Sequence, residues 1–78
     1  MVKIKEARIR SNRLKSIRDH RKMSIWQLRA ITGVSTAVIG AIEKFDYDPV
    51  ETVKERLAQG LQVEKVIIWP ETAEPVMP

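Results

Sequence analysis

The segment SIWQLRAITGVSTAVIGAIEKF, residues 24–45, constrains the fold more than any other part of the chain. Ser24 is followed three positions later by Gln27, a spacing typical of the capping box that starts a helix. Gly33 then suits the left-handed backbone of that helix's C-terminal cap, which disfavours residues with a Cβ atom. Ser35 is a good N-cap for a second helix. The segment therefore predicts two short helices joined by about three residues, the geometry of a helix-turn-helix.

The rest of the chain predicts further helices around this pair. Ser11 or Asn12 can cap a first helix that ends near Lys22, where cationic side chains suit the helix dipole. After the turn sequence FDYDP, a fourth helix is expected over about residues 50–60. The segment EKVIIW then predicts a short helix or a strand that Pro70 stops.

These boundaries divide the chain into three parts. We expect a basic N-terminal arm over residues 1–11, an all-α domain of about five short helices over residues 12–70, and a flexible tail over residues 71–78. The inward side chains of the domain are expected to include Leu14, Ile17, the stem of Arg21, Leu28, Ile31, Val53, Leu57 and Leu61. Trp69 is expected at a helix edge with its polar atom exposed, and Ile67, Ile68 and Trp69, partly surplus to this core, indicate a dimer interface.

Composition excludes several classes of protein. The 78 residues suffice for one small domain, and the absence of cysteine excludes a disulfide framework or a cysteine-ligated zinc site. No apolar run approaches the roughly 20 residues of a membrane span, so we expect a cytoplasmic protein. His20 has no second histidine for a metal site, and no nucleophile–base pair or phosphate-binding glycine loop is evident. We therefore expect neither catalysis nor a metal or cofactor.

Charge is distributed unevenly along the chain. The net charge is +7 over residues 1–22 and −4 over residues 42–78, within a total of +4. Such asymmetry favours one face that meets a polyanion, with nucleic acid the commonest partner. The alternative is a basic N-terminus that is merely well solvated.

The frame around the turn resembles a known family. Gly33, Val34 and Ser35, with Ile39, Ile42 and Glu43 in register, are similar to the phage-repressor and Cro-like helix-turn-helix family, also called the XRE family. The resemblance spans residues 12–70 and implies a lambda-repressor-like bundle of five short helices. Members of this family are commonly transcriptional regulators that bind duplex DNA as homodimers.

The resemblance also implies a site on the helix over residues 35–44. Its early outward positions would lie in the major groove: Ser35, Thr36, Ala37, Gly40 and Ala41. These residues offer methyl contacts and a hydroxyl but no bidentate reader, so direct readout should be weak. The available cations are Arg29, Lys44 and the N-terminal cluster, which includes Arg8, Arg10 and Arg13. We hypothesise that Arg8 or Arg10 enters a narrow minor groove and reads DNA shape.

Taken together, the sequence predicts a small sequence-specific repressor that binds duplex DNA as a homodimer, without a small-molecule ligand. A different interpretation is a helix-turn-helix scaffold used for protein binding, as in an adaptor or anti-repressor, with the small residues of helix 35–44 packed in a partner's groove. The acidic loop FDYD favours that interpretation, because it would repel phosphates. A third is sequence-neutral binding as an accessory DNA protein.

Overall fold

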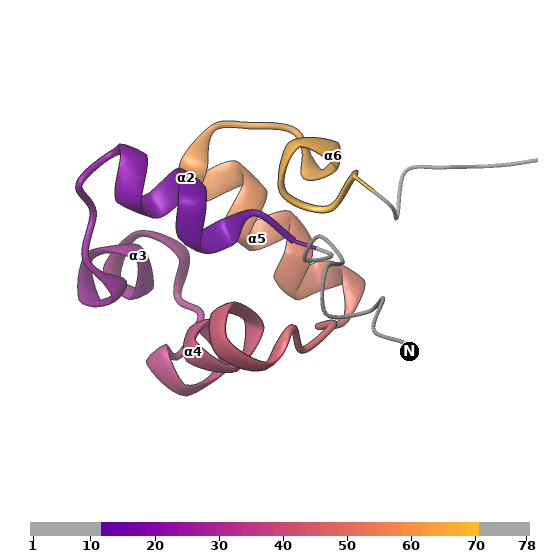
Figure 1. The fold of residues 1–78 in the computed structure, drawn as a ribbon, viewed down its shortest axis with the longest axis horizontal. Coiled ribbons are helices and arrows are strands. Elements are labelled where there is room, and N and C mark those ends of the chain that lie inside the picture. The colour runs from indigo at the N-terminus through magenta and orange to yellow at the C-terminus, as the bar shows by residue number, and fades with distance from the viewer. Residues whose placement is uncertain (1–11, 71–78) are drawn as a thin grey trace, which may run out of the picture.

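The computed structural model describes residues 12–70, in which helices are joined by turns and loops and no strand is present. Its elements are α2 (Leu14–His20), α3 (Ile25–Thr32), α4 (Thr36–Phe45), α5 (Glu51–Leu61) and α6 (Lys65–Ile68). In Figure 1, α2 and α6 lie at the top of the domain, α4 lies at the bottom and α5 runs between them. The predicted all-α fold with five short helices is confirmed. The predicted arm and tail lie outside the described residues.

The helix ends around the turn follow the local sequence. The Ser24 side chain accepts a hydrogen bond from the Gln27 backbone N–H at 3.0 Å, and the Gln27 side chain accepts one from the Ser24 backbone N–H at 2.7 Å. Gly33 has φ +79°, which a residue with a Cβ atom adopts only with strain. Ser35 Oγ accepts from the Val38 N–H at 3.2 Å and caps α4. The predicted capping box, glycine cap and second N-cap are all confirmed.

Elsewhere the predicted boundaries need small corrections. The first helix ends at His20 rather than near Lys22, which has φ +55° and therefore cannot continue a right-handed helix. Its N-cap residue is Arg13, but Asn12 Oδ1 accepts a hydrogen bond from the Leu14 N–H at 3.0 Å. The segment at residues 64–69 contains the helix α6 and not a strand, because no other strand is present in residues 12–70 to pair with it.

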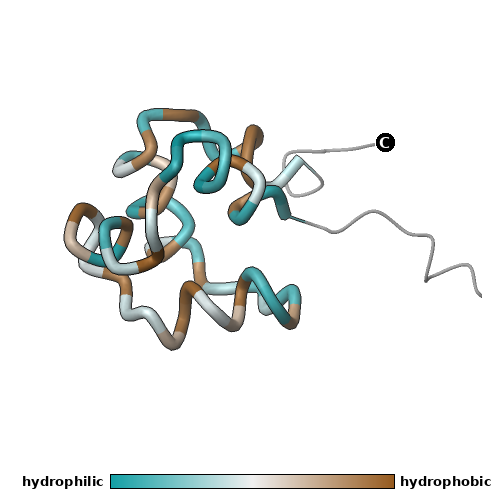
Figure 2. The backbone as a smooth tube through the Cα atoms, turned by 60° about the vertical axis from the view of Figure 1, so that its left-hand side comes forward, coloured by the Kyte–Doolittle hydropathy of each residue, from teal (hydrophilic) through white to brown (hydrophobic). Residues whose placement is uncertain are grey.

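One hydrophobic core joins the helices, and apolar and polar segments alternate along the chain that surrounds it (Figure 2). Leu14, Leu28 and Leu57 are fully buried as expected. The prediction for Ile31 is wrong, because its side chain is 53% exposed at the edge between α3 and α5. Arg21 is also exposed, and its guanidinium donates a hydrogen bond to the Leu61 carbonyl oxygen instead of packing its stem inside.

The residues at the end of α6 are buried, although the sequence predicted that they are exposed. Ile68 and Trp69 are 0% and 1% exposed and belong to the core, so these two residues are not exposed as the predicted dimer interface requires. The expected exposure of Trp69's polar atom is also wrong. Gln62 adopts φ +58° directly after α5, and α6 packs back against α5 from this turn. This return brings Ile68 and Trp69 inside and leaves Ile67 46% exposed.

A buried ion pair holds α2 against α4. Arg18 Nε and Nη2 donate to the two carboxylate oxygens of Glu43, each at 2.8 Å, and Arg18 Nη1 donates to the Met23 carbonyl oxygen at 2.8 Å. The Glu43 side chain is only 5% exposed. The hydrogen bonds to Glu43 raise the pKa of the Arg18 guanidinium above its ordinary value, so Arg18 keeps its positive charge in this contact. Arg18 is therefore engaged inside the domain and is not available to a polyanion.

Candidate functional site

The outward face of α4 carries the residues that the sequence predicted as a site. Ala37, Gly40, Ala41 and Lys44 follow one another at helical spacing, so they share a face. Ala37 and Lys44 are exposed, and Gly40 and Ala41 are half-buried. The opposite face of α4 holds its buried residues Ile39, Ile42 and Glu43.

Ser35 and Thr36 lie at the N-terminal end of the same helix. Ser35 is exposed, and its Oγ is engaged as the cap acceptor, which leaves its O–H free to donate. Thr36 is half-buried and is the first residue of α4. The structure thus brings Ser35, Thr36, Ala37, Gly40, Ala41 and Lys44 together on one helix.

Gly40 makes this face unusually flat. Among residues 12–70, a Cβ atom built at Gly40 would meet no atom within 4 Å beyond its chain neighbours and the backbone of its own helix, so packing inside this domain does not require a glycine there. In the interior of a helix, glycine costs about 1 kcal/mol relative to alanine. The smooth surface over Ala37, Gly40 and Ala41 therefore lets another molecule approach the backbone of α4 closely.

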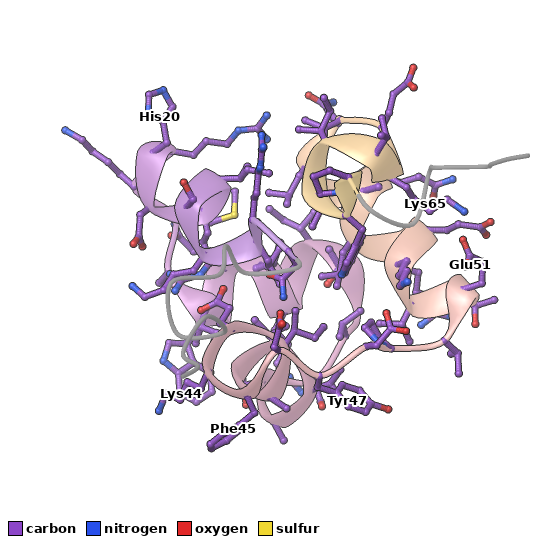
Figure 3. All side chains as sticks on the ribbon, turned by 45° about the vertical axis from the view of Figure 1, so that its right-hand side comes forward. His20, Lys44, Phe45, Tyr47, Glu51 and Lys65 are labelled. Atoms are coloured by element: carbon purple, nitrogen blue, oxygen red, sulfur yellow. The ribbon has the colours of Figure 1, made fainter. Side chains whose placement is uncertain are left out.

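An apolar edge borders this face at the C-terminal end of α4. We define it as Phe45, Tyr47 and Val50, whose side chains are 79%, 49% and 63% exposed. Figure 3 shows Lys44, Phe45 and Tyr47 on the same lower side of the domain. Acidic residues lie between them in the sequence. One of these, Asp48, forms an ion pair with the buried Lys54, with 2.7 Å between Asp48 Oδ1 and Lys54 Nζ.

The predicted cations are not all near α4. Arg29 is exposed on α3 and forms no ion pair within residues 12–70. Arg13 lines a groove between α2 and α6, together with His20 and Ile67, and so lies away from the outward face of α4. Arg8 and Arg10 lie outside the described residues.

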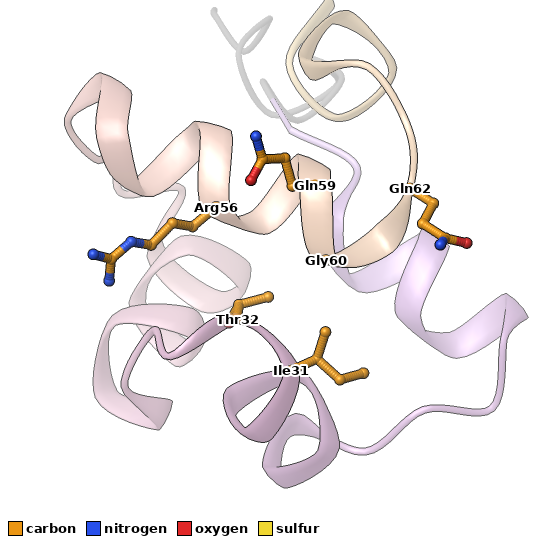
Figure 4. Close-up of a pocket in the computed structure, with 6 residues that line it drawn as sticks. All are labelled: Ile31, Thr32, Arg56, Gln59, Gly60 and Gln62. Carbon is orange, nitrogen blue, oxygen red and sulfur yellow. The ribbon is translucent and has the colours of Figure 1, made fainter.

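Arg56 is a basic residue beside the turn that the sequence analysis did not select. It is exposed on α5, and its Nη1 atom lies 3.9 Å from the position that a Cβ atom on Gly33 would occupy. No local pattern marks it, because its place beside the turn depends on how α5 packs against α3. Figure 4 shows Arg56 at one end of the pocket between these two helices.

The same pocket contains the close contact that sets α3 against α5. A Cβ atom on Gly60 would overlap Thr32 Cγ2 and would lie 3.1 Å from Ile31 Cγ2 (Figure 4). Thr32 is itself fixed, because its Oγ1 donates to the Leu28 carbonyl oxygen at 2.8 Å and accepts from the Val34 N–H at 3.1 Å. Gly60 therefore helps to position the turn that leads into α4.

Metal-ligating clusters and membrane-spanning helices are absent from this part of the chain. Within residues 12–70, no three histidine, aspartate or glutamate side chains gather closely enough to hold a metal ion. None of the helices there is long and apolar enough to cross a membrane. Comparison with known protein families and with curated proteins finds no match to this sequence. The fold defines the class as a small all-α bundle, and the outward face of α4 is its candidate site.

Proposed function

We propose that the protein is a small cytoplasmic regulator that binds duplex DNA as a homodimer and acts as a repressor. In this proposal α3, residues 33–35 and α4 form a helix-turn-helix, and α4 enters the major groove. The observation that carries the proposal is the outward face of α4, which is flat and open at Gly40 and has the cation Lys44 on the same face. Such a surface can lie close to base edges.

Direct readout in this arrangement depends on small groups. The methyl groups of Thr36, Ala37 and Ala41 suit apolar contact with the thymine methyl group, and the Ser35 hydroxyl can donate one hydrogen bond. A bidentate Arg, Asn or Gln contact would add about 1–3 kcal/mol of discrimination, and α4 offers none on this face. We therefore propose that much of the specificity comes from DNA shape, with Arg8 or Arg10 in a narrow minor groove.

Affinity would come mainly from phosphate contacts. Lys44 and Arg29 are the predicted cations nearest in sequence to the turn and α4, and Arg56 beside the turn is a further candidate. If six phosphates were neutralised, the logarithm of the binding constant would fall with the logarithm of salt concentration at a slope of roughly −5. Arg18 would not contribute, since its guanidinium is bonded to Glu43.

A second candidate function is protein binding by the same helix. The observation that favours it is the apolar edge of Phe45, Tyr47 and Val50 at the end of α4, because large apolar side chains exposed as a group are typical of a protein interface. In that case Ala37, Gly40 and Ala41 would pack against a partner's helix. A third candidate is sequence-neutral DNA binding.

Selection from a randomised duplex pool at about 0.15 M salt separates these functions. A palindromic consensus with half-sites about 34 Å apart, one turn of duplex, is the expected result for a dimeric regulator. Retention without a consensus would replace this proposal with sequence-neutral binding. No retention, even at about 0.05 M salt where phosphate contacts are strongest, would reject DNA binding and favour the protein-binding function.

A further inference from the structure

The apolar edge at the end of α4 has no cover within residues 12–70. Phe45, Tyr47 and Val50 lie within six consecutive residues, and Phe45 is the most exposed large hydrophobic residue of the described domain. Large exposed apolar side chains that gather in one place mark interaction sites more often than isolated ones do. The apolar edge therefore has the features of a docking surface.

The point where the N-terminal arm leaves the domain is fixed beside this edge. Asn12 is buried, and its Nδ2 donates to the Ile42 carbonyl oxygen at 3.0 Å and to Asp46 Oδ1 at 2.9 Å. Asp46 directly follows Phe45 and directly precedes Tyr47. An extended chain spans at most about 3.3–3.6 Å per residue, so three residues before Asn12 are enough to span roughly 10 Å from this anchor. The arm therefore begins within a few residues of the surface.

The arm also has a matching composition. Its apolar residues alternate with basic ones over much of its length, as VKIK and ARIR: Val2, Ile4, Ala7 and Ile9 against Lys3, Lys5, Arg8 and Arg10. The apolar edge is interspersed with the acidic residues Asp46, Asp48 and Glu51. Asp46 accepts a hydrogen bond from Asn12, and Asp48 and Glu51 pair with Lys54 and Lys65, so apolar contact must contribute more to docking than charge does. Long basic side chains can reach these carboxylates while their stems lie on apolar surface.

We propose that residues 2–10 of the N-terminal arm dock on the apolar edge of the same chain, with apolar side chains of the arm covering Phe45, Tyr47 and Val50. Covalent linkage gives a short tether an effective concentration in the millimolar range, so a contact too weak to join separate molecules is enough. The C-terminal segment over residues 71–78 is a poorer occupant, because its charged side chains are Glu71 and Glu74 and it has no basic residue.

Docking would change the charge beside the outward face of α4. In the DNA-free protein the cations of the arm would lie next to the acidic loop that follows α4 and would offset its negative charge. This contact belongs to the DNA-free protein and is measured without DNA, since entry of Arg8 or Arg10 into a minor groove would require the arm to leave the apolar edge. Its failure would leave the proposed DNA binding standing, and a failure of DNA binding would leave the docking standing.

A single nitroxide label tests the docking. The chain has no cysteine, so Lys5→Cys provides one labelling position in the arm of the full chain. The expected result is paramagnetic broadening of the backbone amides of residues 45–50 that is several-fold stronger than broadening in α3, on the other side of the turn. Broadening no stronger at residues 45–50 than in α3 would overturn the proposal.

Matched substitutions identify the surface that the arm contacts. Phe45→Ala with Tyr47→Ala should remove most of the selective broadening, whereas Trp26→Ala with Ile31→Ala, which removes exposed side chains from α3, should leave it unchanged. Persistence of the broadening in the first variant would contradict docking on the apolar edge. In a mixture of nitroxide-labelled protein without ¹⁵N and ¹⁵N-labelled protein without nitroxide, we expect no broadening. Broadening in that mixture would show that the arm occupies a second copy instead.

Discussion

Gly40 and Gly60 both lie inside helices, but alanine should have opposite effects at the two positions. At Gly40 the added methyl group meets open space, so the gain in helix propensity, about 0.5–1 kcal/mol, is unopposed. At Gly60 the same gain is opposed by overlap with Thr32 Cγ2. Thr32 cannot simply rotate away, because its hydroxyl is held by two hydrogen bonds.

The difference between the two variants isolates the packing cost. The propensity gain is common to both and cancels, which leaves the overpacking term of about 1–3 kcal/mol. Urea unfolding followed by far-UV circular dichroism measures both free energies of unfolding, and we expect Gly40→Ala above the parent chain and Gly60→Ala below it. Thr32→Ser keeps the hydroxyl and removes Cγ2. It should therefore lower the free energy of unfolding less in the Gly60→Ala variant than in the parent chain. A Gly60→Ala variant as stable as Gly40→Ala would refute the argument that this contact sets α3 against α5.

Two further predictions concern ion pairs. Arg18→Met leaves the Glu43 carboxylate buried without its guanidinium and should cost about 3–5 kcal/mol in free energy of unfolding, with a smaller cost when Glu43→Gln is also present; additive losses in urea unfolding would contradict the direct pair. The hydrogen bond from Lys65 lowers the pKa of Glu51 in the folded protein. The stabilisation from this contact is therefore fully present above the pKa that Glu51 has in the unfolded chain, and it is lost as pH falls through the pKa of Glu51 in the folded protein. At low salt, Glu51→Gln should therefore make the melting temperature fall less steeply as the pH is lowered. An unchanged dependence of the melting temperature on acid pH would rule out a contribution from the Glu51–Lys65 contact.

The fold was predictable where local sequence decides it. The capping box at Ser24, the left-handed cap at Gly33 and the N-cap at Ser35 each depend on a few neighbouring residues, and all three are present in the structure. Burial at the C-terminal end was not predictable in the same way. Trp69 enters the core because α6 folds back on α5, and the centroid of its ring lies 5.3 Å from Nζ of Lys54 on that helix. Nothing in the local sequence of EKVIIW specifies that return.

The candidate site was likewise predictable where local sequence decides it and not where packing between helices does. Helical spacing alone places Ala37, Gly40 and Lys44 on one face, once the ends of α4 are known. The cations around that face depend on packing between helices. Arg13 lies on the groove between α2 and α6, whereas Arg56, to which no sequence pattern pointed, lies beside the turn.

The central claim is that the outward face of α4 contacts DNA, and a matched pair of charge changes tests it most directly. Ala37→Glu and Ser16→Glu each place one carboxylate at an exposed position in the first turn of a helix, on α4 and on α2 at opposite sides of the domain (Figure 1). Both variants change the net charge equally and suit the helix dipole.

Fluorescence anisotropy with a duplex from the selected pool measures the dissociation constants of both variants. We expect Ala37→Glu to weaken binding at least about tenfold, or about 1.4 kcal/mol, because the carboxylate would meet base edges and phosphates at close range. Ser16→Glu should change the constant by no more than about twofold, since a charge beyond about 8 Å is largely screened at 0.15 M salt. Equal effects of the two substitutions would contradict the claim that α4 lies in the groove.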